Sequence, residues 1–361
     1  EDRAFSLPTL EPLNREPENL SGYALLSLPN MTLAPLDWAI IVVYLVGCMV
    51  AGIWMRRYIS HVDDFTVAGR EMDVNLGIAS LAATEMGLVT IMYTAQLGFE
   101  KGFVGASIGV IWALCLYLVG RTGFVIGPLR KAGVVTIPEL FEKRFSLKVR
   151  ILAGFFLAVG GILNMGIYLR LGGEFLVHVT GMPAHSLQWV MAVLLGLVLL
   201  YTVLGGMLSV LVTDFLQFIV MGLGIVITSI LVVMQVGWSN LVDGLWNHWL
   251  VAQASAPAGA TASAAHPFNP FHATSFGSGY LLWQMILILS AVTTWQTMVT
   301  RVLASKDEAT AKKMYRRTAF YFVGRFALPG LWGAAALIYF TNHGGLPDGL
   351  DSLKAMPAYL A

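Results

Sequence analysis

The chain has 361 residues, of which 57% are hydrophobic and 12% are charged, and its formal net charge is +1. A soluble domain of this size carries about twice this charged fraction, and a nucleic-acid-binding protein needs a basic surface, so the composition argues against both classes. The charges are clustered and leave long apolar runs between them. Such runs indicate a multi-spanning all-α membrane protein whose first partner is the lipid bilayer.

The apolar runs predict a transmembrane domain of about eight helices over 37–340. A polar extracellular segment over 1–36 precedes it, and an extracellular segment over 341–361 follows it. In chain order, the predicted spans are 37–55, 76–98, 103–120, 151–178, 187–204, 207–236, 279–300 and 318–340.

Two connections between the spans have recognisable patterns. TIPELFEKRF, within 121–150, predicts a short helix capped by Thr136, with a proline in its first turn. The connection 237–278 is expected outside the cell. Its stretch AQASAPAGATASAAHPF is of low complexity and is expected to be mobile.

The distribution of Lys and Arg predicts the orientation in the cell membrane. If the N-terminus lies outside, sixteen of these residues, Arg301 among them, fall in cytoplasmic segments and four fall outside. This bias predicts an external N-terminus, and it supports the eight-span count because one missed span would scramble it.

Glu85 is the first ionisable group inside a span, where a charge is costly and therefore a functional candidate. It lies in LAATEMGLVTIMYTAQLGF, roughly 13 Å from the start of that span at 1.5 Å per residue, near the midplane. Thr84 and Gly87 flank it, so we predict that the helix is interrupted between about Ala82 and Gly87. Carbonyl groups freed there would bind a cation. The alternative is a protonated glutamate bonded to a neighbouring helix.

Asp214 is the second such group, in YTVLGGMLSVLVTDFLQF. A nearby sodium ion, or the hydroxyl groups of Ser209 and Thr213, would offset the cost of its charge. A structural hydrogen-bonded carboxyl near the inner surface is the alternative interpretation.

Arg170 and Glu174 are four residues apart in the fourth span and are expected to share a helix face. They form either a structural ion pair or a site in which Arg170 faces a cavity and binds a substrate carboxylate. Arg325, in the eighth span, is expected to snorkel or pair without a functional role.

Further candidates for solute binding are uncharged. They are Thr90 in the second span and Thr294, Trp295 and Gln296 in the seventh, although polar groups in spans also serve helix packing. The histidines lack zinc-site spacing, and the chain has no phosphate loop and no nucleophile–base set. We therefore expect neither an enzyme nor an organic cofactor.

Four stretches carry a resemblance to a known family: DDFTVAGREMD, ASLAATEMG, YTVLGGMLSVLVTDFLQ and TRVLASKDEATAKK. They resemble the sodium/solute symporter family, which includes sodium/proline and sodium/glucose symporters. The resemblance implies a LeuT-type fold of five-plus-five helices in inverted repeats, with an extra N-terminal helix. Spans two to six would form the first repeat. Spans seven and eight would begin a second repeat that is incomplete here, so the sequence is expected to be a fragment.

The resemblance also implies a sodium site. The backbone carbonyl groups of Ala83 and Met86 match sodium ligands, Glu85 falls where proline symporters have an aspartate, and Asp214 matches an aspartate close to the sodium path. Oxygen ligands of this kind suit a hard cation. Ile288 and Ala291 replace an asparagine and a gating tyrosine of the sugar symporters, which disfavours a sugar substrate.

These observations predict a sodium-coupled transporter that imports a small polar organic solute by alternating access, with Na⁺ as the coupling ion. The alternatives are a proton-coupled transporter of the same fold and a non-transporting membrane sensor or truncated product.

Overall fold

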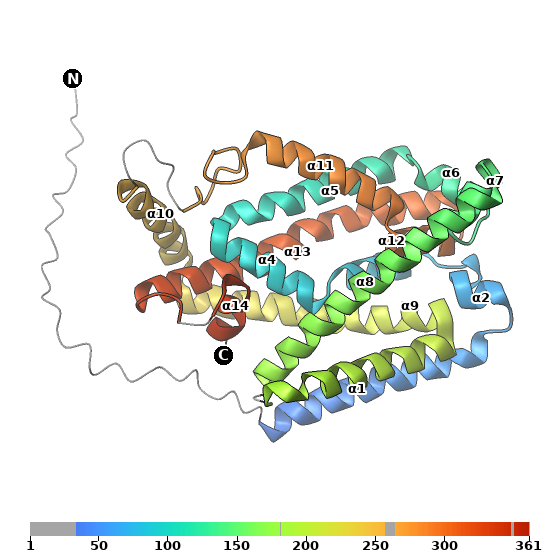
Figure 1. The fold of residues 1–361 in the computed structure, drawn as a ribbon, viewed down its shortest axis with the longest axis horizontal. Coiled ribbons are helices and arrows are strands. Elements are labelled where there is room, and N and C mark those ends of the chain that lie inside the picture. Colours follow the sequence, from blue (N-terminus) through green and yellow to red (C-terminus); the bar gives the residue numbers. More distant parts are fainter. Residues whose placement is uncertain (1–33, 181, 257–263, 348–349, 361) are drawn as a thin grey trace, which may run out of the picture.

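The computed structural model describes residues 34–180, 182–256, 264–347 and 350–360, which form a bundle of helices (Figure 1). Within these ranges the only β-type pairing is an isolated parallel bridge between Met72 and Ser305. Most of the predicted segment 1–36 and the centre of the low-complexity stretch, 257–263, lie outside the described residues.

The α-helices are α1 (Pro35–Trp54), α2 (Val62–Val67), α3 (Val74–Glu85), α4 (Leu88–Lys101), α5 (Ala106–Thr122), α6 (Ile126–Lys131), α7 (Ile137–Arg144), α8 (Leu147–Val179), α9 (Leu187–Val236), α10 (Trp238–Ala254), α11 (Gly277–Thr294), α12 (Gln296–Ala304), α13 (Glu308–Asn342) and α14 (Ser352–Leu360). Short 3₁₀ turns cover Met55–Tyr58, Ala68–Arg70, Gly102–Gly105 and Ala184–Ser186.

Four of the predicted ranges are interrupted or joined. The second is divided into α3 and α4 around Met86 and Gly87, which confirms the predicted interruption. The seventh is divided into α11 and α12 at Trp295, a break that the sequence did not reveal. The fifth and sixth lie on α9, which changes direction at Gly206, where φ is 50° and ψ is −150°.

Four of the helices, α2, α6, α7 and α10, lie in the predicted connections between spans. The predicted capped helix is α7, where the Glu139 N–H donates to the Thr136 hydroxyl at 3.3 Å, as expected. Helix α10 occupies the first part of the connection 237–278, for which no helix was predicted.

By length and composition, six stretches of the described residues can cross a membrane. They are Pro35–Tyr58, Leu88–Thr122, Leu147–Val177, Thr202–Val236, Gly277–Thr294 and Glu308–Asn342. This number is below the predicted eight because α4 and α5 count as one stretch and the first part of α9, Leu187–Leu200, is short.

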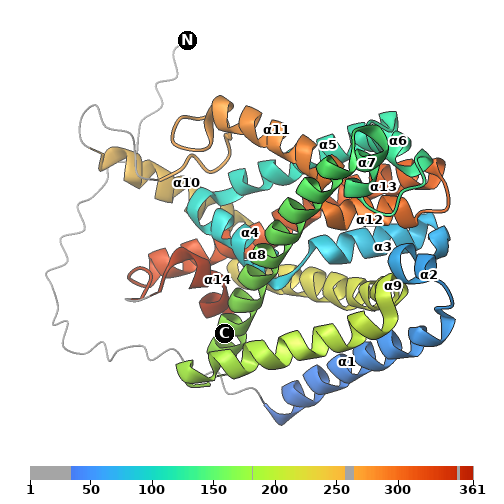
Figure 2. The same ribbon diagram turned by 45° about the vertical axis from the view of Figure 1, so that its right-hand side comes forward.

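Helix α13 forms the centre of the bundle, whereas α1 and α8 lie at its periphery (Figures 1 and 2). In the most apolar window of α13, 67% of the residues are buried, against none in that of α8.

Glycines bring α4 and α13 into backbone contact, since a Cβ atom on Gly98 would lie 1.9 Å from the carbonyl oxygen of Gly330. Such close approach is typical of packed membrane helices, and here it places the second half of α13 beside the last turn of α4.

The two ends of the bundle differ. Helices α10 and α14 lie at one end, and α2, α6 and α7 lie at the other (Figure 1). At the second end the Met72 N–H donates to the Ala304 carbonyl at 3.1 Å and the Lys306 N–H donates to the Met72 carbonyl at 3.2 Å. Arg130 of α6 donates to the Ser305 and Lys306 carbonyls at 2.6 and 3.0 Å. The start of α3 is thus tied to the end of α12.

Candidate functional site

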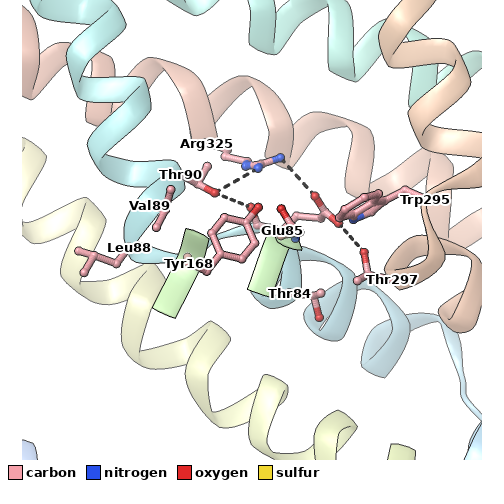
Figure 3. A pocket seen from close by; sticks show the side chains of 11 residues that line it. Thr84, Glu85, Leu88, Val89, Thr90, Tyr168, Trp295, Thr297 and Arg325 are labelled. Carbon is pink, nitrogen blue, oxygen red and sulfur yellow. Dashed lines mark hydrogen bonds and ion pairs between the residues drawn. The ribbon is translucent and has the colours of Figure 1, made fainter. Parts of the chain in front are cut away.

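Two interrupted helices meet at one pocket. Met86 (φ −114°, ψ 89°) leaves the helical conformation after α3, and Trp295 (φ −63°, ψ 119°) does so after α11. A break inside a membrane helix is tolerated where the freed backbone groups face a cavity. The pocket measures about 250 Å³ and is lined by Thr84, Glu85, Gly87, Leu88, Val89, Thr90, Asn164, Tyr168, Trp295, Thr297 and Arg325 (Figure 3).

Glu85 lies where the interrupted helices and α13 come together. Its Oε1 accepts a hydrogen bond from the Thr297 hydroxyl at 3.0 Å, and its Oε2 lies 3.8 Å from Nη1 of Arg325 (Figure 3). Its side chain is only 10% exposed. The buried Glu85 side chain therefore links α3 to Thr297 of α12 and to Arg325 of α13.

Arg325 is the functional candidate that sequence reasoning missed. Of its two expected roles it pairs, and it does not snorkel: its side chain is 9% exposed and lines the pocket. Its Nη2 donates to the Thr90 hydroxyl over a long 3.5 Å, while Nε and Nη1 have no hydrogen-bond partner. Hydropathy cannot say which way a cation on a span points, so no signal in its own sequence window could have identified this role.

Asp214 belongs to a second buried ion pair, with Arg301. Its Oδ2 accepts hydrogen bonds from Ser80 at 2.6 Å, Thr84 at 3.1 Å and Arg301 at 2.9 Å. Arg301 also donates to the hydroxyl oxygens of Ser80 and Thr84 and to the Thr297 carbonyl. We call Ser80, Thr84, Asp214 and Arg301 the Asp214 cluster. It joins α3, α9 and α12.

The Asp214 cluster corrects one expectation. Ser209 and Thr213 do not support Asp214: the Ser209 hydroxyl donates to the Gly52 carbonyl at 2.8 Å, and that of Thr213 to the Ser209 carbonyl at 3.0 Å. Arg301, which the sequence analysis counted only among the charges of a cytoplasmic segment, is 5% exposed and is the partner of Asp214.

The predicted sodium ligands Ala83 and Met86 lie at the first break, and both residues are buried. The Ala83 carbonyl accepts a hydrogen bond from the Met86 N–H at 3.1 Å, which leaves that oxygen a second lone pair.

The uncharged solute-binding candidates separate into two groups. Thr90 and Trp295 line the pocket. Thr294 and Gln296 are not among the lining residues: the Thr294 hydroxyl donates to the Ser290 carbonyl at 2.8 Å, and the Gln296 amide donates to the Thr300 hydroxyl at 3.3 Å.

Arg170 does not line the pocket. Its side chain is 70% exposed, and its Nε lies 2.9 Å from Oε1 of Glu174 on the same helix. The predicted orientation toward a cavity is therefore not observed, and the structural ion pair is what the geometry shows. The α8 residues that do line the pocket are Asn164 and Tyr168, which lie on another side of the helix.

The amino-acid sequence is similar to those of several known proteins. A mouse protein, solute carrier family 5 member 4A, is 32% identical over 58% of this chain and 32% of its own length. The Vibrio parahaemolyticus sodium/glucose cotransporter is 28% identical over 59% and 41%, respectively. The high-affinity proline transporter PutP of Bacillus subtilis is 27% identical over 52% and 41%. These relatives are transporters, in agreement with the expectation that the chain is not an enzyme.

A solved structure shares the fold. It is the substrate-bound, outward-open state of a Na⁺-coupled sialic acid symporter, with a TM-score of 0.74 and 19% identity over 91% of this chain and 65% of that one. This likeness confirms the LeuT-type architecture. The chain spans about a third to two fifths of the length of the relatives above. The model of the sodium:solute symporter family matches residues 65–343, and the chain belongs to that family.

Proposed function

We propose that the protein is a sodium-coupled secondary transporter that imports a small polar organic solute by alternating access. The observation that carries the proposal is the pocket between the breaks at Met86 and Trp295. Discontinuous helices that meet around a polar cavity are how transporters of this kind expose backbone groups to solute and ion. Membership of a sodium-coupled family supports the same function.

The proposed sodium ligands are the carbonyl oxygens of Ala83 and Met86, with the carboxylate of Glu85 beside them. They lie at the C-terminal end of α3, where the helix dipole places a partial negative charge. Asp214 is proposed to lie on the path of the ion to the cytoplasm. Because Arg301 holds its Oδ2 in this conformation, Asp214 would take part only after that contact opens.

The proposed solute site is the pocket itself. Thr90 and Thr297 offer hydroxyl groups, Trp295 and Tyr168 offer aromatic surfaces, and Arg325 offers a buried cation. Polar groups at a few points of an otherwise apolar cavity are typical of sites for small molecules.

Uptake into proteoliposomes tests the proposal. The complete protein is reconstituted, and uptake of labelled L-proline, D-glucose and a mixture of other small solutes is measured with an inward sodium gradient and with choline in its place. We expect accumulation of at least one solute above its external concentration, only with sodium. If a solute accumulates in choline medium when a proton gradient is applied, the coupling ion is the proton and not sodium. Binding of a solute without accumulation under either gradient would favour the sensor.

A further inference from the structure

Arg325 is a buried cation with too few partners. A guanidinium carries five N–H groups, and nearly all buried donors in proteins are satisfied. Here Nη2 has one long hydrogen bond, to Thr90 at 3.5 Å, and Nη1 approaches Glu85 only to 3.8 Å. Nε and Nη1 are fully buried and have no hydrogen-bond partner.

The other contacts of Arg325 do not satisfy its N–H groups. The rings of Phe322, Phe326 and Trp112 lie 4.9, 5.5 and 5.7 Å from the guanidinium carbon. Aromatic rings attract a cation through their π faces, but they are poor acceptors for N–H groups that point along the plane of the guanidinium. The unsatisfied donors therefore await an acceptor that the described residues do not supply.

Glu85, across the pocket from Arg325, has an oxygen atom free to accept a hydrogen bond. Its Oε1 accepts one from the Thr297 hydroxyl at 3.0 Å. Its Oε2 has no hydrogen bond to the described residues and lies 3.8 Å from Nη1 of Arg325. A pair with a purely structural role would close to hydrogen-bonding distance, as Asp214 and Arg301 do at 2.9 Å. The wide separation fits a pair whose members also bind other groups.

We infer that the transported solute carries a carboxylate group and that Arg325 binds it; this inference rests on the proposed function of the pocket. The planar guanidinium matches the two oxygens of a carboxylate, and such charge-assisted pairs are stronger than bonds to neutral groups. A neutral sugar hydroxyl would satisfy one N–H at a time. A doubly charged phosphate would be opposed by Glu85.

Binding of a carboxylate shifts Arg325 from Glu85 to the solute, so Glu85 is left to attract a positive charge. That charge is either the coupling sodium ion or the amino group of a zwitterionic solute. Both satisfy the same carboxylate oxygen, and the experiment below includes solutes with and without an amino group.

The test measures the thermal unfolding midpoint of the purified complete protein in saturating sodium, titrated with probes. The probes are the common L-amino acids, a set of small hydroxy acids including lactate, and D-glucose as the neutral reference. We expect stabilisation by at least one carboxylate. The apparent affinity for it should fall roughly 10- to 100-fold in Arg325→Gln, as for loss of hydrogen bonds to a charged group. Arg325→Lys, which keeps the charge but loses the planar fork, should fall between. Arg170→Gln is the matched control and should leave the affinity unchanged, because Arg170 lies outside the pocket.

A double variant separates binding from a structural role. Arg325→Gln with Glu85→Gln removes both charges, so no unpaired buried charge remains to disturb folding. If Arg325 contacts the solute, the double variant folds and still binds the carboxylate weakly. The inference is overturned if the double variant recovers the parent affinity, if no carboxylate stabilises the protein, or if only glucose does. Sodium-driven uptake of glucose that is unaffected by Arg325→Lys would also overturn it while leaving the proposed function intact.

Discussion

Two buried ion pairs among the described residues are similarly buried, but one has complete hydrogen bonding and the other does not. Asp214 and Arg301 are 10% and 5% exposed, and Glu85 and Arg325 are 10% and 9% exposed. The first pair is closed at 2.9 Å and surrounded by the hydroxyl groups of Ser80 and Thr84. The second is separated by 3.8 Å and leaves two guanidinium nitrogens without a partner.

The difference shows how a membrane protein can use one buried ion pair to fix its helices and another to bind a ligand. A buried charge is stabilised only when its partners are complete, so the Asp214 cluster is suited to fixing α3, α9 and α12 in one arrangement. In a pair with incomplete hydrogen bonding, by contrast, the free donors and acceptors can bind a ligand. The sequence positions of the two arginines, 24 residues apart, give no hint of this division of roles.

The largest expected effect is loss of the closed pair. Arg301→Gln leaves Asp214 as an uncompensated buried charge, which typically costs about 3–5 kcal/mol in the free energy of unfolding. Unfolding of the purified protein in mixed micelles measures this. Combining Arg301→Gln with Asp214→Asn removes both charges and should restore more than half of the loss. Equal instability of the single and double variants would show that the cluster is held by packing and not by its charges.

A smaller effect is expected at the contact that positions the open pair. Gly98→Ala forces α4 away from the backbone of α13, and overpacking of this kind costs about 1–3 kcal/mol. Because Thr90 lies two turns along the same helix, the substitution should also weaken solute binding at the pocket while sparing the Asp214 cluster. Gly160→Ala, on the exposed surface of α8 with no atom within 4 Å of the new Cβ, is the control and should be neutral or slightly stabilising. Solute binding and unfolding are measured on both variants. An unchanged solute affinity in Gly98→Ala would contradict the expected link between the α4–α13 contact and the pocket.

The smallest expected effect concerns an exposed carboxylate at the start of α13. The Thr310 N–H donates to Asp307 at 2.7 Å, and this hydrogen bond lowers the pKa of Asp307 below its ordinary value of 3.8. A lowered pKa in the folded state means that the cap stabilises the helix fully above the ordinary pKa. The contribution is lost as the pH falls through the lowered value.

Asp307→Ala should therefore cost about 0.5–2 kcal/mol near neutral pH and less in strong acid, as measured by unfolding at several pH values. Asp307→Ser keeps a capping oxygen and is the control. A pH-independent difference between Asp307→Ala and the parent would contradict this assignment.

The sequence predicted the parts of the fold that have local causes. The break after α3 was predictable because Gly87 and polar neighbours interrupt an apolar run, and α7 because Thr136 and a proline form a recognised start signal. The predicted spans 187–204 and 207–236 also meet close to Gly206, where α9 changes direction. The break at Trp295 was not predictable, since neither glycine nor proline marks it.

The site depended on tertiary contacts that no local pattern encodes. Glu85 was identified because a carboxyl group stands out in an apolar run, but its partner Arg325 is 240 positions away in the chain and was assigned no role. Arg301 was only counted among the charges of a cytoplasmic segment, since sequence alone does not show that α12 turns its side chain toward Asp214. Arg170, for which the sequence left a structural ion pair and a solute-binding role open, lies outside the pocket.

The backbone bridge between Met72 and Ser305 has a mechanical consequence. Its two hydrogen bonds join main-chain atoms, so no side-chain substitution removes them directly, and they fasten the start of α3 to the end of α12. The half-helix before the first break and the half-helix after the second are therefore joined at this end through their main chains. Arg130 of α6 and Asp214 of α9 contact this joined pair through side-chain hydrogen bonds. In the proposed transport cycle we expect α3 and α12 to move together, and these polar contacts to break when this end of the protein opens.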